Sequence, residues 1–105
     1  MNEKDLTENA IRDLVIANRI LARENIIDGF GHVSVRNPVD PERFFLSRSR
    51  SPEIVTRDDI MEFDLDGTLL SDDPRRPYAE RFIHGAIYRA RPDVNAVSHH
   101  HAPAV

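Results

Sequence analysis

The fold can be worked out from the segment HVSVR at residues 32–36, in which apolar and polar side chains alternate. Such alternation predicts a β-strand with one buried face. Upstream, residues 5–25 carry apolar side chains at steps of three and four, which predicts an amphipathic helix. Gly29 and Gly31 lie between the two segments, so we expect the helix to end there and a turn to lead into the strand.

Three further segments extend the predicted sheet. Residues 44–47 predict a second strand, and residues 56–59 combine an N-cap threonine with acidic residues, which predicts a single helical turn. Residues 61–65 and 68–70 flank the tight-turn signal Asp66-Gly67 and predict a hairpin. The eight acidic residues from position 53 to position 73 are then expected mainly on its solvent-exposed face.

A second helix is expected to begin near Pro77 and to stop before Pro92. Its apolar stripe is predicted to consist of Phe82, Ile83, Ala86, Ile87 and Ala90. Residues 94–98 predict a last strand that leads into three consecutive histidines. The order of helix, strands, hairpin, helix and strand indicates a layered α/β or α+β domain.

Composition limits the classes of protein that fit. The 105 residues are 40% hydrophobic and 30% charged, as in ordinary globular chains, and suffice for one domain at most. A net charge of −4 argues against nucleic acid as a partner, and the lack of cysteine excludes disulfides and thiolate zinc sites. No apolar run approaches the roughly 20 residues that span a membrane, so we expect a soluble, cytoplasmic protein.

The end of the sequence predicts an incomplete domain. A strand that carries three histidines is costly at a free terminus, and Ala104-Val105 supplies no cap or polar tail to close the fold. We therefore interpret residues 1–105 as one partial domain.

The histidines of the last strand are candidate metal ligands. His99 and His101 project from one face of a strand, about 6.6 Å apart along the backbone, while His100 points the other way. Two neutral imidazoles at this spacing can bind one divalent ion. The simpler interpretations are a shortened affinity tag or surface histidines on an edge strand.

Glu80 and His84 are candidate catalytic residues. Glu80 is expected in the first turn of the second helix, where a carboxylate ordinarily interacts with the helix dipole. The expected helix places Glu80, Ile83, His84 and Ile87 on one face, so the carboxylate would need a partner, and a cation is one candidate. Taken alone, His84 is explained more simply as a hydrogen-bonded helix residue than as a ligand.

The loop after the second strand offers donors for an anion. Arg48 and Arg50 flank Ser49, and alternate arginines can present forked donors to a carboxylate or phosphate. Solvated loop arginines are the simpler interpretation. Ser47, Ser49 and Ser51 are interpreted first as turn residues.

Taken together, these segments resemble the first half of the class II aldolase/adducin family. The landmarks are GHVSVR at residues 31–36, FLS at 45–47, RPD at 91–93, Glu80 with His84, and His99 with His101. The nineteen residues between Glu80 and His99 are similar to the family's spacing between its acid/base glutamate and its first metal-binding histidine. The resemblance covers nearly the whole chain.

The resemblance implies roles for several residues. His99 and His101 would bind a divalent metal ion, zinc or manganese, and a third histidine would follow downstream. Glu80 would transfer protons, with His84 as a second candidate. His32 and Tyr78 occupy places where the family's aldolases hold the substrate phosphate with an asparagine and serines, so with Ser47, Arg48 and Arg50 they are predicted to bind a flat anionic substrate.

The resemblance also implies a fold and an activity. The fold would be a three-layer α/β/α arrangement around a mostly antiparallel sheet, present here only as its N-terminal half, and relatives commonly form tetramers. Residues 29–36 and 46–53 resemble the branch that decarboxylates hydroxylated aromatic dicarboxylates, which predicts a metal-dependent carbon–carbon lyase. The alternatives are a sugar or sugar-phosphate aldolase or epimerase, a non-catalytic adducin-like association module, or an inactive truncated fragment.

Overall fold

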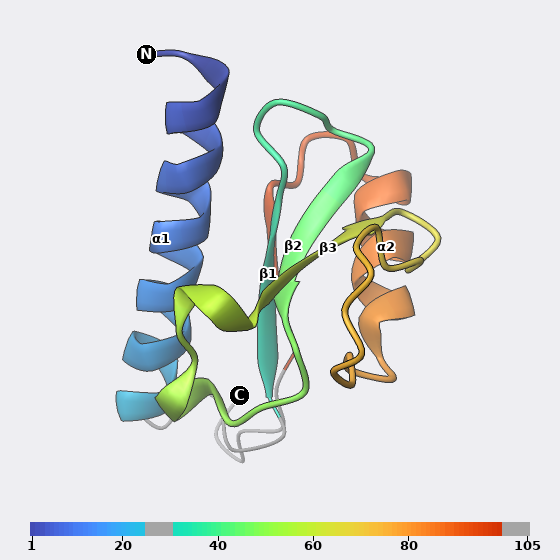
Figure 1. The fold of residues 1–105 in the computed structure, drawn as a ribbon. Coiled ribbons are helices and arrows are strands. Elements are labelled where there is room, and N and C mark those ends of the chain that lie inside the picture. The colour runs from blue at the N-terminus through green and yellow to red at the C-terminus, as the bar shows by residue number, and fades with distance from the viewer. Residues whose placement is uncertain (25–30, 100–105) are drawn as a thin grey trace.

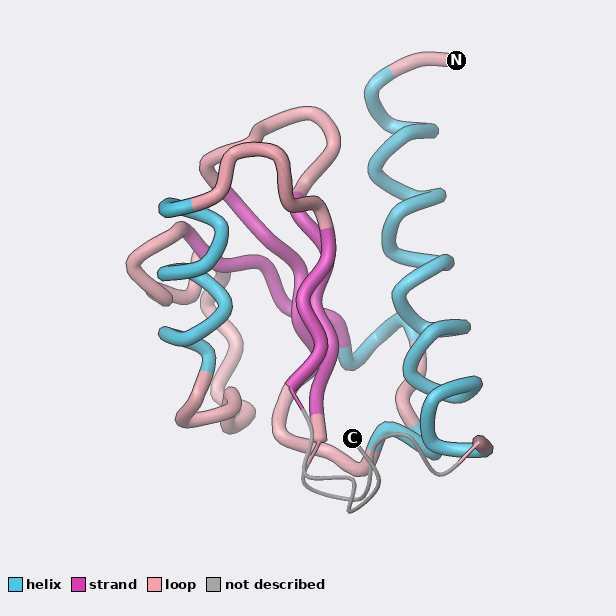
Figure 2. The backbone as a smooth tube through the Cα atoms, turned by 180° about the vertical axis from the view of Figure 1, so that it is seen from behind, coloured by secondary structure: helices cyan, strands magenta, loops and turns pink. Residues whose placement is uncertain are grey.

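A computed structural model describes residues 1–24 and 31–99 and shows three layers, with a sheet between two helices (Figure 1). The view from behind shows the same order, with one helix on each face of the strands (Figure 2). The predicted three-layer α/β/α arrangement is confirmed. The elements, in chain order, are α1 (Glu3–Arg23), β1 (His32–Arg36), β2 (Arg43–Ser47), the 3-10 turns η1 (Pro52–Ile54) and η2 (Arg57–Asp59), β3 (Ile60–Asp64), α2 (Arg81–Ala90) and β4 (Ala96–His99).

The four strands form one antiparallel sheet in the order β3-β2-β1-β4. The mostly antiparallel sheet was predicted correctly. The register places His32 of β1 directly opposite His99 of β4. Side chains directly opposite each other in an antiparallel pair lie on the same face, so the register alone brings these two histidines together.

The side chains of strand β1 alternate between the two faces of the sheet, so that one set faces α1 and the other set faces α2. Its odd-numbered residue Val33 packs with Phe45 of β2 against Ile11 and Leu14 of α1. The helix α1 begins with a side-chain cap, in which Asn2 accepts a hydrogen bond from the Asp5 N–H. The predicted amphipathic helix is thus confirmed, and it covers the apolar face of β1.

The opposite face holds a second core beneath α2. Its buried members are Phe44, Leu46, Met61, Phe63, Leu65, Tyr78 and Tyr88. The even-numbered residues of β1 on this side are polar, namely His32, Ser34 and Arg36, and all three are buried. The helix that covers them must therefore offer hydrogen-bonding partners as well as apolar surface.

Helix α2 starts later than the sequence predicts. It begins at Arg81, because Pro77 still forms an isolated bridge to Arg48 and the following Tyr78 hydroxyl is bound to the Arg50 backbone. Glu80 consequently occupies the N-cap position and not the first turn. Its carboxylate makes no capping bond, which leaves it available for other partners.

The predicted buried stripe of α2 is wrong. Phe82 and Ile83 are 52% and 40% exposed, whereas His84, Gly85 and Tyr88 are buried against the sheet. The helix is rotated in this way because its partner is the polar side of β1, which His84 and Tyr88 can hydrogen-bond and the aliphatic residues cannot.

The hairpin is only partly as predicted. Its first arm is β3, and Gly67 adopts a positive φ of 83° in the turn, a conformation that glycine adopts without strain. The second arm makes a single bridge, between Phe63 and Leu69, and does not continue as a strand.

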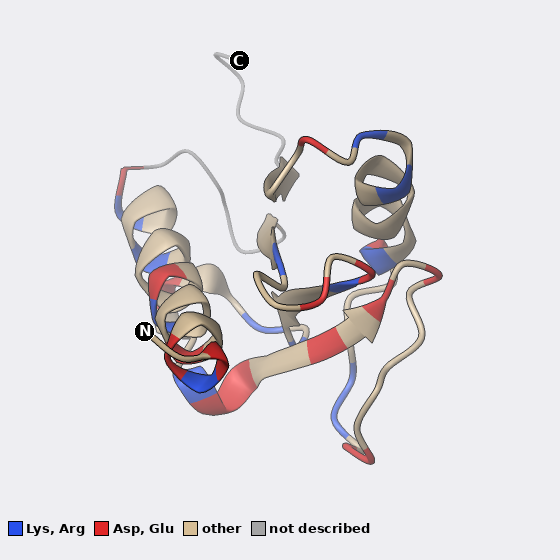
Figure 3. Ribbon diagram, turned by 90° about the horizontal axis from the view of Figure 1, so that it is seen from above, with Lys and Arg blue, Asp and Glu red and all other residues tan. Residues whose placement is uncertain are grey.

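Acidic and basic residues are interspersed along α1 and along the loops (Figure 3). None of the described helices is long and apolar enough to cross a membrane.

Candidate metal centre

Three side chains from three elements meet at one end of the sheet. His32 comes from β1, His99 from β4, and Glu80 from the N-cap of α2. The two imidazoles stack with their ring centroids 4.9 Å apart and an interplanar angle of 14°. The stacked pair presents both rings to the same carboxylate.

Glu80 bridges the two histidines. Its Oε1 lies 3.4 Å from His32 Nε2, and its Oε2 lies 3.2 Å from His99 Nε2. The His32 side chain is 1% exposed, whereas those of His99 and Glu80 are 25% and 47% exposed. The group is therefore anchored in the interior through His32 and open to solvent on the side of Glu80.

This group fits a divalent metal ion. One ligand atom from each of His32, Glu80 and His99 lies within 4.8 Å of the other two. Two imidazoles and one carboxylate form a donor set that catalytic zinc sites use, and manganese accepts the same atoms. The position of His99 is therefore consistent with its predicted role as a metal ligand, and Glu80 adds a carboxylate beside it. His101, the other predicted ligand, lies outside the described residues.

His84 lies behind His32 and does not reach the group directly. Its Nε2 is 2.6 Å from His32 Nδ1, its Nδ1 is 2.6 Å from Ser34 Oγ, and the residue has no exposed surface. Burial, together with the nearby His32 and His99, lowers the pKa of His84 to about 3. As a direct proton donor to a substrate His84 is misplaced, because both ring nitrogens are already engaged inside the protein.

Ser34 and Tyr88, which were not predicted from the sequence as site residues, complete the buried hydrogen-bonded cluster around His32 and His84. Ser34 lies on β1 two residues after His32, and its Oγ is 2.7 Å from the Tyr88 hydroxyl. Tyr88 lies on α2 four residues after His84. Both spacings place side chains on one face, of a strand and of a helix respectively, and this was the available signal.

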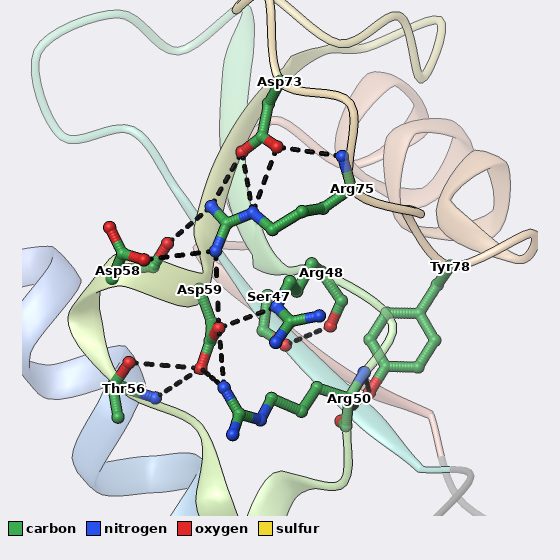
Figure 4. A network of polar contacts seen from close by, with 9 residues as sticks. All are labelled: Ser47, Arg48, Arg50, Thr56, Asp58, Asp59, Asp73, Arg75 and Tyr78. Carbon is green, nitrogen blue, oxygen red and sulfur yellow. Dashed lines mark hydrogen bonds and ion pairs between the residues drawn. The ribbon is translucent and has the colours of Figure 1, made fainter.

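The two predicted anion-binding arginines converge on a buried carboxylate (Figure 4). Arg48 Nε donates to Asp59 Oδ1 at 2.8 Å, and Arg50 donates from one terminal nitrogen to both oxygens at 3.1 and 3.2 Å. Thr56 adds its backbone N–H and its hydroxyl to Oδ2. Asp59 is 1% exposed and is the exception among the eight acidic residues of positions 53–73, because the other seven are exposed or partly exposed as expected.

Tyr78 lies between this arginine loop and the candidate metal site formed by His32, Glu80 and His99. Its ring lies 4.7 Å from the His32 ring, and its hydroxyl donates to the Arg50 carbonyl at 2.5 Å. Ser47, predicted to bind substrate, is 1% exposed and donates its hydroxyl to the Arg48 carbonyl. Of the residues predicted to bind substrate, His32 thus lies in the group itself, Tyr78 lies against it, and Arg48 and Arg50 lie beyond Tyr78.

We call Asp59 and its donors Arg48, Arg50 and Thr56 the Asp59 cluster, and we expect this cluster to make the stability of the fold sensitive to acid. Burial alone would raise the pKa of the Asp59 carboxyl, but hydrogen bonds from Arg48, Thr56 and Arg50 hold that pKa well below its ordinary value. The stability that this lowered pKa contributes is present above about pH 4 and is lost as the pH falls toward the folded-state pKa. We expect the free energy of unfolding, from urea titrations, to fall by on the order of 2 kcal/mol between about pH 5 and pH 2.

The control is another aspartate with a lowered pKa, Asp93, whose side chain is 66% exposed beside Arg91. Asp93→Asn should leave the pH profile of stability unchanged, because an exposed pair contributes little. Asp59→Asn should flatten the profile. An unchanged slope in Asp59→Asn would contradict the role given to this carboxylate.

Comparison with known proteins finds relatives that are named decarboxylases. Over 97 residues the chain is 36% identical to "Decarboxylase tropJ" of Talaromyces stipitatus, a match that covers 90% of this chain and 36% of the relative. It is 34% identical to a "3,4-dihydroxyphthalate decarboxylase" of Arthrobacter keyseri, with 95% of this chain and 44% of the relative covered. The chain thus spans about two fifths of the length of these relatives.

The fold has a solved counterpart. An L-fuculose 1-phosphate aldolase from Glaciozyma antarctica superposes with a TM-score of 0.86 at 29% identity, over 96% of this chain and 43% of the other. Residues 12–105 match the family described as "Class II Aldolase and Adducin N-terminal domain". The chain therefore belongs to the class II aldolase and adducin N-terminal domain family.

Proposed function

We propose that this chain carries the metal-binding half of a carbon–carbon lyase, a decarboxylase that acts on a hydroxylated aromatic dicarboxylate. The observation that carries the proposal is the convergence of His32, Glu80 and His99 on one point. Two relatives with decarboxylase names match 90% and 95% of the chain, which favours carbon dioxide release among the reactions of the family. Residues 1–105 are then the N-terminal part of a longer domain, and the cytoplasm and a homo-oligomer are the expected setting.

The metal ion would be held by His99 and Glu80, joined by the predicted ligand His101. Bound there, the ion supplies a positive charge that stabilises negative charge on a substrate oxygen as carbon dioxide leaves. The half-exposed Glu80 carboxylate can exchange protons with solvent and with a substrate beside it. The role of His32 depends on which ring nitrogen carries its proton.

The surroundings favour an anionic, flat substrate. Arg48 and Arg50 carry two positive charges, and the buried carboxylate of Asp59 that both contact carries one negative charge. Tyr78 stands between that loop and His32, and its buried ring packs against the His32 ring. One carboxylate of the substrate would contact the arginine loop. The substrate's hydroxyl and its second carboxylate would lie at the candidate metal site.

A sugar-phosphate aldolase is the second candidate, because the solved structure with a TM-score of 0.86 has that activity in its description. Both reactions leave negative charge on the substrate, and a bound metal ion would stabilise that charge. They differ in the product that leaves, and this difference separates them by experiment.

The test is the reaction of the full-length protein that contains residues 1–105, loaded with zinc or manganese, with 3,4-dihydroxyphthalate, followed by the release of carbon dioxide. We expect release, and we expect Glu80→Gln to lower its rate at least 100-fold, the usual size of a lost acid/base group. Glu53→Gln removes an exposed carboxylate elsewhere and serves as the matched control.

Normal turnover in Glu80→Gln would remove Glu80 from the reaction. Cleavage of L-fuculose 1-phosphate without carbon dioxide release would decide for the aldolase.

A further inference from the structure

A chain of short hydrogen bonds connects Tyr88 to His32 through the interior between α2 and the sheet. Its links join Tyr88 to Ser34 at 2.7 Å, Ser34 to His84 at 2.6 Å, and His84 to His32 at 2.6 Å. All four residues are at most 1% exposed. Each link therefore needs one donor and one acceptor from these side chains themselves.

The Tyr88 hydroxyl sets the direction in which the protons are donated. Burial raises the pKa of Tyr88 to about 12, so the oxygen keeps its proton. Ser34 Oγ is thus the acceptor for the Tyr88 proton among the partners shown in the described part of the chain.

The remaining links follow from this first one. Ser34 accepts from Tyr88 and must donate its own proton to His84 Nδ1, its other partner. His84, buried between a hydroxyl and an imidazole, is neutral, and a neutral ring that accepts at Nδ1 carries its proton on Nε2. This proton is donated to His32 Nδ1. His32 then carries its own proton on Nε2, the nitrogen that faces Glu80.

The reverse order of donors is disfavoured. It would turn the Ser34 proton toward Tyr88 and leave the Tyr88 proton without an acceptor among the described residues, in a site whose members are at most 1% exposed. An unsatisfied buried donor costs enough to favour the first order by roughly tenfold or more.

We propose that Tyr88, Ser34 and His84 are positioning residues that hold His32 as an N–H donor toward the candidate site. An Nε2 that carries a proton has no lone pair to offer a metal ion, so the ligands on the described residues are His99 and Glu80. The His32 N–H instead faces the Glu80 carboxylate of the candidate site, with Nε2 3.4 Å from Oε1, and donates a hydrogen bond to it. This role rests on the proposed function, whereas the position of the proton is a property of the metal-free chain.

The position of the proton is measured by NMR on metal-free protein with 15N-labelled histidines, at slightly alkaline pH. The two ring nitrogens of a neutral histidine have well-separated 15N shifts, and His32→Asn identifies the His32 signals by their loss. We expect His32 with a protonated Nε2 and an unprotonated Nδ1. A proton on Nδ1 would overturn the proposal.

Two variants test the relay behind His32. Tyr88→Phe frees Ser34 from accepting a proton, and Ser34→Ala removes the link altogether, so in each variant the His32 shifts should move toward a mixture of the two tautomers. Tyr78→Phe is the matched control, because this tyrosine also packs against His32 but donates to Arg50. Shifts that stay unchanged in Tyr88→Phe and Ser34→Ala, or that move equally in Tyr78→Phe, would contradict the relay.

A zinc titration separates the inference from the proposed function. If His32 is a donor and not a ligand, His32→Asn should keep zinc affinity within about fivefold of the parent chain. A loss as large as that in His99→Asn would make His32 a ligand and overturn the inference while leaving the proposed function intact. A parent chain that binds no zinc, with His32 protonated on Nε2, would count against the proposed function alone.

Discussion

Gly85→Ala is expected to destabilise the protein by about 1–3 kcal/mol, although alanine favours helices. A Cβ at this position would lie 2.2 Å from the Leu65 carbonyl oxygen and 2.9 Å from its carbonyl carbon. Both atoms belong to the backbone after β3 and cannot rotate away. Helix α2 must therefore shift from the sheet, and the loss of packing exceeds the roughly 1 kcal/mol that alanine gains by helix propensity.

The measurement is urea unfolding of the parent and the variant. Ala86→Ser adds an atom at the next, exposed position of α2 and should change stability by less than about 0.5 kcal/mol. Because α2 carries Glu80 at its N-cap, the shift in Gly85→Ala should also weaken zinc binding. A variant as stable as the parent would show that α2 does not pack as closely on Leu65 as the structure has it.

The orientation of α2 shows where sequence patterns stop being informative. Five apolar residues at helical spacing predict one buried face, yet the face that meets the sheet carries His84 and Tyr88. The strand sequence indicates the actual orientation of the helix, because alternation in HVSVR puts His32 and Ser34 on the side opposite Val33. A polar strand face needs a helix with hydrogen-bonding side chains, and this pairing across 50 residues is a tertiary effect.

The Asp59 cluster illustrates a different limit. Arg48 and Arg50 were expected to bind an anion and they contact the Asp59 carboxylate, but the acidic stretch around Asp58-Asp59 offers several candidate partners of equal appearance in the sequence. Burial selects Asp59, which follows from how η2 packs at the start of β3. Knowledge of tertiary packing was not needed to predict the strands and the long first helix. It was also not needed for the proximity of Glu80 and His99, which the family resemblance implied.

His99→Asn is expected to lower the zinc affinity of the chain at least 100-fold, or about 2.7 kcal/mol. Asparagine is too short to place a ligand atom where His99 Nε2 lies, 3.2 Å from Glu80 Oε2, and an amide oxygen binds zinc less well than an imidazole. Among the described strands β4 lies at the edge of the sheet, and the His99 side chain is 25% exposed, so the substitution should leave the fold intact.

Isothermal titration with zinc measures the effect, and binding of Co²⁺ followed by its visible absorption reports on the same ligands. Glu80→Gln should also lose affinity, because a neutral amide replaces the carboxylate that bridges His32 and His99. Glu53→Gln changes the net charge by the same amount at an exposed position and should bind zinc as the parent does. Equal affinities in His99→Asn and Glu53→Gln would place the metal elsewhere, because only the first of the two variants alters a residue of the group.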